Sequence, residues 1–474
     1  MPTSNSPPMH GEDWQSHISR IEQLARAQGL KYHPVEFEVV PESFMTEIAI
    51  YGLPVRMPHW SFGVRYIYQL IQHRMGLSRL FEVVFPGNPG RAYLAKSNSA
   101  AENVLVTAHV LGHADFSTNN MLFRRSQEQV GEHIVEQAAA HARQIAMAIQ
   151  EHGLERVELV LDAALSLEQH VDIDQGLRRP RYPETLPDRS APVAVDDEFA
   201  KRFAALGPDT ARPQSTGPAK KAPIPPHPEC DLLWFIAQYA PEMEPWERDI
   251  FLAVREESFY FYPVFACQIM NEGWASYWHA RLLREADFLP ASAYVDAIKC
   301  HSDVVRPTAT GENVALATNP YHLGFSIWEK IVEAQGLDAA RRIMSEDDDF
   351  SFVRNHLTHE LASELKLFRF KGPATGTLTV QEMDLPALHE ALLAPKYGFG
   401  APRVSASRVH LDGKLELVHD HVTDGRGLDP ERARRVLEYV ARVWRRPVTL
   451  VTVDSDHRSV EISVSPGLTP SFNR

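Results

Sequence analysis

The sequence predicts a mainly α-helical core that carries a proline-rich insertion and is followed by a small α+β domain of ββαββ order. Apolar residues recur at helical spacing over most of residues 10–370. Prolines gather in one stretch, and two hairpin patterns flank a helix after residue 400. The expected parts are a first part of the core (1–171), the insertion (172–228), a second part of the core (229–372), a connecting region (373–400) and the tail domain (401–474).

Composition narrows the class of protein. The 474 residues can bury a large core without disulfides. The formal net charge of −14 argues against a general nucleic-acid binder, because neutralising phosphates requires a basic excess. No apolar run is long enough for a membrane span, and the first residues do not resemble a signal peptide. The three cysteines are far apart and form no disulfide framework, so we expect a cytoplasmic protein.

The first part of the core begins with a helix from Trp14 to Leu24, which ends before Gly29. The string VEFEVV at 35–40 alternates like a short strand. A further helix is predicted at 63–73, and residues 102–120 are apolar and carry histidines. One long helix is predicted from Gln127 to His152.

The insertion at 172–228 differs from the rest of the chain. It holds eleven of the 34 prolines and few aromatic residues, so it cannot bury enough surface to offset the ordering of its backbone. We expect an exposed and partly disordered segment, with one short helix near 196–206.

Helical patterning resumes at Leu232 and continues to about residue 370. In the tail, strands at 404–411 and 414–419 flank an Asp-Gly turn. Asp429 and Pro430 then begin a helix that runs to about Trp444, and residues 448–453 and 459–463 are predicted to form a second hairpin.

The string AHVLGHAD at 108–115 is the first candidate site. His109 and His113 are four residues apart, which on a helix places both imidazoles on one face. HExxH helices hold zinc with this spacing, but Val110 stands where those helices carry their glutamate base. The alternative is that both are ordinary helix histidines with structural partners.

The string MNEGWASYWH at 270–279 is the second candidate. A gluzincin-type site takes two histidines from one helix and a glutamate from another, and Glu272 is the candidate for that third ligand. His279, two helical turns later, is a candidate fourth ligand or supports the ligands from outside. Alternatively, the aromatic residues are core and Glu272 pairs with an arginine. The metal-binding interpretation predicts a zincin-like core, with Asp115, Glu256 or Glu257 as the base.

Three weaker candidates involve other histidines. In NPYHLG at 319–324, Tyr321 and His322 could line a pocket, together with Asn271, although a lone histidine there is more often structural. His59 and Trp60 line a pocket or begin a helix. The tail histidines are expected at the surface and are His410, His419 and His421.

Other common catalytic patterns are missing from the sequence. It contains no GxxxxGK[ST] phosphate loop, no GxGxxG dinucleotide fingerprint and no GxSxG nucleophile elbow. The residues therefore favour a metal site over nucleotide chemistry or serine hydrolysis.

Several strings together resemble the SpoVR family, the stage V sporulation protein R-like proteins. These are PHWSFG (58–63), AHVLGHADF (108–116), MNEGWASYWH (270–279), NPYHLG (319–324) and SFVRNHLT (351–358). They occur in the expected order over nearly the whole chain. Leu111 departs from the pattern, since an aromatic residue is expected between the two histidines. The EGWA string is also similar to one in gluzincin-like bacterial proteins, where the glutamate ligates zinc.

The resemblance implies a role in sporulation, through spore cortex formation, or in a bacterial stress response. It also implies partners such as a serine kinase or a von Willebrand-type protein. Two hypotheses about activity stay open. The chain is a metal-dependent, hydrolase-like enzyme with a divalent cation, zinc first, or it is a non-enzymatic regulator or scaffold with a structural metal site or none.

Overall fold

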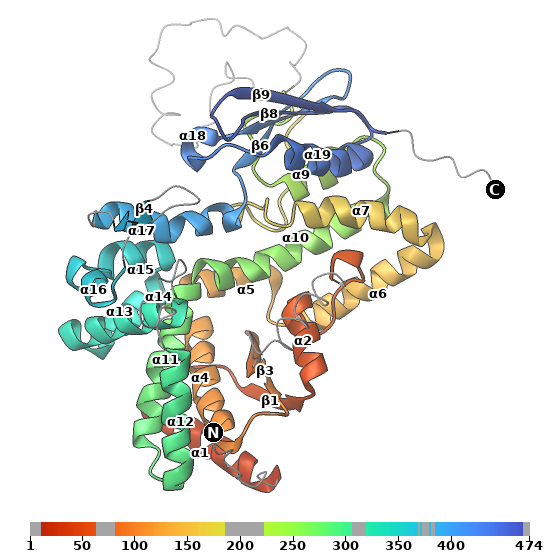
Figure 1. Ribbon diagram of the computed structural model, residues 1–474. Helices are drawn as coiled ribbons and strands as arrows, with labels where there is room; N and C mark the ends of the chain where they lie inside the picture. Colours follow the sequence, from red (N-terminus) through yellow and green to blue (C-terminus); the bar gives the residue numbers. More distant parts are fainter. Residues whose placement is uncertain are drawn as a thin grey trace, which may run out of the picture.

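The computed structural model describes residues 11–62, 81–184, 222–305, 319–367, 370–371, 379–380 and 384–467. Within these ranges the protein is mainly helical, and a small four-stranded sheet lies in its C-terminal part, as predicted (Figure 1). The helices predicted at 63–73 and near 196–206 lie outside the described residues. Among the described helices, none has both the length and the apolar composition needed to cross a bilayer.

The N-terminal part combines helices with a small mixed sheet. In chain order its elements are α1 (Gly11–Ala27), β1 (Val35–Val40), α2 (Glu42–Tyr51), β2 (Glu82–Phe85), β3 (Gly90–Ala95) and α4 (Ala100–Asn119). The strand order is β1-β3-β2, in which β1 runs parallel and β2 antiparallel to β3. β1 has the predicted bounds, whereas the sequence patterns did not indicate the β2–β3 hairpin.

The long helix predicted from Gln127 to His152 is wrong, because two helices occupy this stretch. α5 (Met121–Val130) stops at Gly131, and α6 (Ile134–His152) begins three residues later. Gly131 has a φ of +95°, which lies outside helical backbone, and its N–H closes α5 on the carbonyl of Gln127. α7 (Leu154–Ser166) follows after a second positive-φ glycine, Gly153.

The second half of the core is a succession of helices. Their bounds are α9 (Leu232–Tyr239), α10 (Pro245–Ala266), α11 (Gln268–Glu285), α12 (Ala291–Val304), α13 (Pro320–Gln335), α14 (Leu337–Glu346), α15 (Asp349–His356), α16 (His359–Glu364) and α17 (Leu385–Leu393). A two-stranded pair, β4 (Phe370–Lys371) and β5 (Thr379–Val380), precedes α17, and the 3-10 segment η2 (Ala394–Gly400) follows it. α11 runs alongside α4 and α12 (Figure 1).

Glycines allow α11 to approach its neighbours closely. A Cβ at Gly112 of α4 would lie 2.7 Å from the Cα of Ala275. A Cβ at Gly324 of α13 would lie 2.0 Å from the carbonyl oxygen of Ile269, and one at Gly273 would lie 2.3 Å from Gly324. Any larger residue at these three positions would push the helices apart. This explains why the motifs that carry the histidines and the glutamate contain glycine there.

A buried ion pair fixes the start of α11. The carboxylate of Asp349 accepts hydrogen bonds from the backbone N–H groups of Ile269 and Met270, at 2.9 and 2.8 Å. Lys396, from η2, lies 2.9 Å from the same carboxylate. A carboxylate at a helix N-terminus satisfies free N–H groups and complements the helix dipole. Asp349 therefore holds the helix that carries the candidate glutamate.

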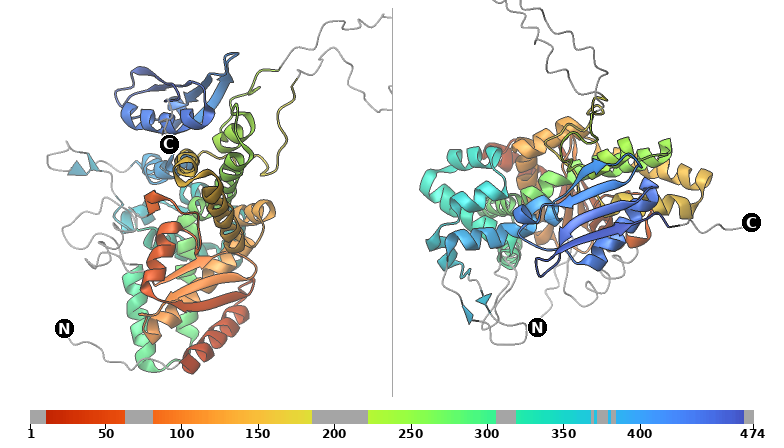
Figure 2. Two further views of the ribbon diagram at one scale, coloured as in Figure 1. Left: turned by 90° about the vertical axis from the view of Figure 1, so that its right-hand side faces the viewer. Right: turned by 90° about the horizontal axis from the view of Figure 1, so that it is seen from above.

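The C-terminal unit contains β6 (Val404–Val409), β7 (Leu415–His419), the short α18 (His421–Asp424), α19 (Pro430–Trp444), β8 (Val448–Val453) and β9 (Ser459–Val464). The strand order is β6-β7-β8-β9, with β7 and β8 parallel and the outer pairs antiparallel. Figure 2 shows α19 against one face of this sheet. The bridge between Glu229 and Ala406 connects the sheet to the segment before α9.

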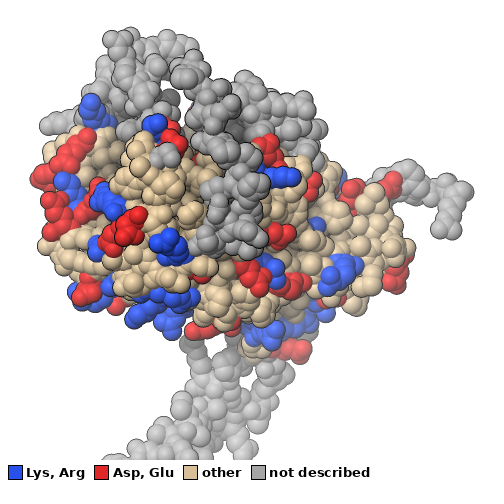
Figure 3. Space-filling view, turned by 90° about the horizontal axis from the view of Figure 1, so that it is seen from below, with Lys and Arg blue, Asp and Glu red and all other residues tan. Residues whose placement is uncertain are grey.

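The tail histidines are not all at the surface. His419 is only 2% exposed, and its ring lies 2.9 Å from the Thr452 hydroxyl and 2.8 Å from Asp424. The expected surface position is therefore wrong for His419. This residue is the last of β7, and its side chain faces the core. On the face drawn in Figure 3, the basic and acidic side chains of the described residues are interspersed.

Candidate metal centre

Three side chains from two helices converge in the core. His109 and His113 project from α4, and Glu272 projects from α11. The two Nε2 atoms lie 3.0 Å apart, and each lies 3.5 Å from Glu272 Oε2. All three atoms lie within 4.8 Å of one another, close enough to ligate one cation. Residues separated by more than 150 positions thus meet as the two motifs predicted.

The local sequence explains why α4 presents the histidines inward. Ser99 and Glu102 form a capping box that starts the helix, with hydrogen bonds of 3.3 and 2.6 Å between side chains and backbone. The helix is buried along nearly its whole length, so its polar residues need partners inside the protein. For the histidines, those partners come from α11.

Hydrogen bonds orient both imidazoles. His113 Nδ1 lies 2.8 Å from Asn271 Oδ1. Because an amide oxygen only accepts, Nδ1 carries a proton, and in the neutral ring the Nε2 lone pair faces the centre. This is the arrangement that histidine ligands of metals adopt, with the second ring nitrogen bonded to an oxygen outside the centre.

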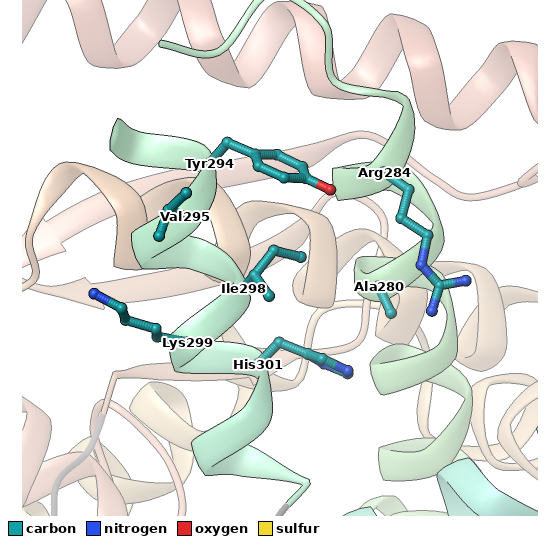
Figure 4. A pocket seen from close by; sticks show the side chains of 7 residues that line it. All are labelled: Ala280, Arg284, Tyr294, Val295, Ile298, Lys299 and His301. Carbon is teal, nitrogen blue, oxygen red and sulfur yellow. The ribbon is translucent and has the colours of Figure 1, made fainter. Parts of the chain in front are cut away.

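His279 lies behind His109 and not among the converging atoms. Its Nδ1 is 2.9 Å from His109 Nδ1, and its Nε2 is 2.5 Å from Nδ1 of His301 on α12. The ring of His301 points towards α11 from a surface cavity of about 350 Å³ (Figure 4). His279 was predicted as a ligand or a supporting group, and this geometry favours the supporting role.

The carboxylate of Glu272 has the features expected of a metal ligand. Its Oε2 is buried and accepts no hydrogen bond from the described residues, although it faces the two imidazoles. Burial would raise the pKa of this carboxyl, but His113 and His109 outweigh that effect and lower the pKa to about 2. A cation would satisfy a buried anionic oxygen to which no other described residue donates a hydrogen bond.

The two histidines differ in their ionisation. Burial and the neighbouring His113 lower the pKa of His109. Burial also acts to lower the pKa of His113, but Glu272 and Asn271 outweigh it, so that pKa is raised. A cation would therefore displace a proton from His113, and its binding should weaken as the pH falls.

Sequence reasoning missed Glu82. It lies in β2, with Oε1 3.9 Å from His109 Nε2, and burial raises the pKa of its carboxyl to about 7. A single glutamate in a four-residue strand carries no spacing pattern, so no motif could have indicated it. Tyr321 also adjoins the cluster, with its ring stacked on His109 at 6.0 Å. The charge of Glu272 and then burial raise the pKa of the Tyr321 hydroxyl.

The three carboxylates predicted as bases are engaged in other contacts. Asp115 accepts hydrogen bonds from the Lys31 backbone and from Trp274 Nε1, at 2.7 and 2.9 Å. Glu257 pairs with Arg56 Nε at 2.7 Å. Glu256 and Glu257 flank His141 on either side, at 3.7 and 3.6 Å. These contacts bind helices to one another and to the N-terminal segment.

Some residues predicted to line a pocket contact the cluster and others do not. Asn271 and Tyr321 do, as described above. His59 and Trp60 instead both bind Asp162 of α7, at 3.0 and 2.8 Å. The pKa of His322 is lowered by burial, and its ring interacts with the backbone of Val305.

Two cavities adjoin the cluster. One, of about 290 Å³, is lined by Glu82, His109, His279 and Tyr321 among others. The other, of about 490 Å³, is lined by Asn271 and Glu272 together with residues of α2, α10 and η2. His109 is buried, His113 and Glu272 are partly buried, and the cluster adjoins space on two sides.

The fold and the cluster define a mainly helical protein with a candidate two-histidine, one-glutamate metal centre. The chain belongs to the SpoVR-like protein family, whose family model matches residues 10–393, and the SpoVR-like C-terminal domain matches residues 402–455. It is 26% identical over 491 positions to the uncharacterized protein YcgB of Escherichia coli (strain K12), with 94% of each chain covered. No solved structure matches it.

Proposed function

We propose that the protein binds one divalent cation through His109, His113 and Glu272 and uses it in hydrolysis, with zinc the first candidate. The observation that carries this proposal is the convergence of two imidazole Nε2 atoms on Glu272 Oε2, a buried oxygen without a hydrogen bond from the described residues. Two histidines and a glutamate form the protein ligand set of several zinc hydrolases. The same set also suits Fe(II), so the metal's identity is part of the test.

A cation held by these three residues would act as a Lewis acid and would lower the pKa of a water towards neutral pH. The residues around it would then orient the ligands and accept protons. Asn271 holds His113 with its Nε2 facing the centre. Glu82 lies on the side of His109. It would supply the basic carboxylate that HExxH helices carry at the position of Val110. We propose it as the base in preference to Asp115, Glu256 and Glu257, whose carboxylates are engaged elsewhere.

A second candidate function has a specific observation in its favour. Glu82 Oε1 lies 3.9 Å from His109 Nε2, which makes this carboxylate a candidate fourth ligand. Four protein ligands would make a closed, structural site. The protein would then be a regulator or scaffold. A role in sporulation or stress response and the kinase or von Willebrand-type partners stay proposals that rest on the family resemblance. A cytoplasmic location stays a proposal that rests on the spacing of the cysteines.

Metal content tests the proposal. Untagged protein is purified, supplemented with zinc or iron and measured by inductively coupled plasma mass spectrometry. We expect about one metal per wild-type chain. His113→Ala and Glu272→Ala should lose it, whereas His322→Ala should keep it, since His322 lies outside the cluster. A wild-type protein without stoichiometric metal would overturn the proposal.

Glu82→Gln separates the two functions. If Glu82 is a base, the variant keeps its metal and loses hydrolysis in a screen of amide and ester substrates. If Glu82 closes a structural site, the variant loses metal and stability together.

A further inference from the structure

The larger of the two cavities is built like a site for a small molecule. Its volume of about 490 Å³ lies in the range of ligand pockets, and it lies beside Glu272 at the N-terminal half of α11. Segments far apart in the sequence contribute to it: α2, α10, α11 and η2. η2 lies between the two stretches that match the family models, residues 10–393 and 402–455.

One wall of the cavity is aromatic. It consists of Tyr51, Phe261, Phe265 and Phe399. Phe399 packs edge-on against Tyr262 at 4.9 Å and lies 5.5 Å from Phe265. A wall of this kind removes an apolar or aromatic group from water and makes favourable ring contacts with it.

The backbone at Phe399 is strained. Its φ is +57°, in the left-handed region that favours glycine and penalises a bulky side chain. Gly398 before it and Gly400 after it also have positive φ. Strain of this kind persists where the surroundings over-determine it, and such positions cluster at ligand sites. Here it places an aromatic ring on the cavity.

Three residues of α11 give the cavity a polar lining. Gln268, Asn271 and Glu272 share one face of α11. Asn271 Oδ1 accepts from His113, and Gln268 Oε1 lies 3.4 Å from Lys396 Nζ. Their amide nitrogens donate no hydrogen bond to another of the described residues, so they can donate to a ligand, and donors beside a cation suit a carbonyl oxygen.

The charges in the cavity disfavour an acidic ligand. Arg56 is the one cation among the described lining residues, and it pairs with Glu257 at 2.7 Å and with Glu168 at 3.2 Å. Its charge is therefore compensated by carboxylates that belong to the protein. The ligand that matches this lining carries no negative charge and combines an apolar group with a carbonyl.

We propose that this cavity is the acyl site of the enzyme and takes amides of apolar or aromatic carboxylic acids. The inference rests on the proposed metal-dependent function. The carbonyl lies towards Glu272 and the donors of α11, and the apolar group lies against the Phe399 wall. In the hydrolysis, the carbon–nitrogen bond breaks and a carbon–oxygen bond to water forms. One proton of water goes to the leaving amine, and the acid is released.

Hydroxamates test this assignment, because they bind a metal in place of a carbonyl. The probes are acetohydroxamate, 3-phenylpropanohydroxamate, which adds a benzyl group, and gluconohydroxamate, which adds hydroxyls. Their affinities are measured by calorimetry on zinc-loaded protein whose metal content is determined first. We expect the phenyl probe to bind about tenfold more tightly than acetohydroxamate.

Phe399→Gly removes the ring while allowing the positive φ. We expect this variant to lose most of the preference for the phenyl probe over acetohydroxamate. Its metal content and its affinity for acetohydroxamate should stay unchanged. Tyr397→Ala is the control, since its ring packs on Phe350 and does not line the cavity. Equal affinity for the acetyl and phenyl probes, or tighter binding of gluconohydroxamate, would overturn the acyl site while the metal centre stands. A metal-free wild type would overturn both.

Discussion

His109 Nδ1 lies 2.9 Å from His279 Nδ1, on the side of the ring opposite to Glu272. If Nε2 of His109 faces a cation, Nδ1 must carry the proton and donate it to His279. His279 then donates from Nε2 to His301, 2.5 Å away. The row of three imidazoles therefore fixes the form of His109 that can act as a ligand.

The first prediction concerns the outer member of this row. His301→Leu removes the acceptor for His279 Nε2, so we expect metal affinity to fall about tenfold, as is common when support behind a ligand is lost. His301→Asn supplies an amide oxygen as acceptor and should restore most of the affinity. Competition with a fluorescent zinc chelator measures both.

Lys299→Leu is the matched control, because Lys299 lines the same surface cavity but points away from the row (Figure 4). If His301→Leu binds metal as tightly as Lys299→Leu, then the row does not orient His109.

The second prediction concerns His141, which Glu256 and Glu257 flank. Burial alone would lower the pKa of His141, but the two carboxylates raise it to about 9 from 6.5. Because the folded-state pKa is the higher one, the stabilisation is complete below pH 6.5 and is lost as the pH rises towards 9. A shift of this size corresponds to about 3 kcal/mol at full strength. Because His141 is partly exposed and water screens its ion pairs, we expect about 2 kcal/mol of unfolding free energy to disappear over this window.

Urea denaturation at pH 6.5 and 9 measures this loss. His141→Gln should be less stable than wild type at pH 6.5 and should lack the His141 share of the pH dependence. If wild type and variant lose the same unfolding free energy between pH 6.5 and 9, His141 is not held in its charged form.

The third prediction concerns the glycine contact between α11 and α13. In Gly324→Ala the new methyl would lie 2.0 Å from the carbonyl oxygen of Ile269, so the helices must separate. We expect a loss of about 3 kcal/mol in unfolding free energy and weaker metal binding, because Glu272 is carried on the displaced helix.

The control for this substitution is Gly176→Ala, where the nearest atom to a new Cβ is 3.9 Å away. It should change stability by no more than about 0.5 kcal/mol. If the two substitutions cost the same, close packing does not set the position of α11.

Much of the fold and the centre could be predicted from the sequence, because local patterns carried the information. VEFEVV alternates and forms β1, and Asp429 with Pro430 begins α19 at the expected residue. The spacing of His109 and His113 indicated a shared face, and their chemistry called for a carboxylate such as Glu272. These inferences need only residue type, period and the preferences of helix ends.

Other features depend on tertiary contacts that no local pattern records. Gly131 divides α5 from α6 within a stretch whose apolar period continues across the break. Glu82 reaches the centre through the pairing of β2 with β3, and His419 is buried through the order of strands in the C-terminal sheet. Phe399 takes its place on the cavity through a backbone conformation that sequence preference disfavours.

X-ray absorption at the metal edge of the zinc-loaded protein tests the central claim most directly, because it counts and identifies the atoms bound to the cation. We predict two imidazole nitrogens and at least one oxygen at about 2.0–2.2 Å. In Glu272→Ala, any metal that remains should have fewer oxygen neighbours. A spectrum with sulfur neighbours, or one without the multiple scattering of imidazoles, would contradict the claim that His109, His113 and Glu272 hold the metal.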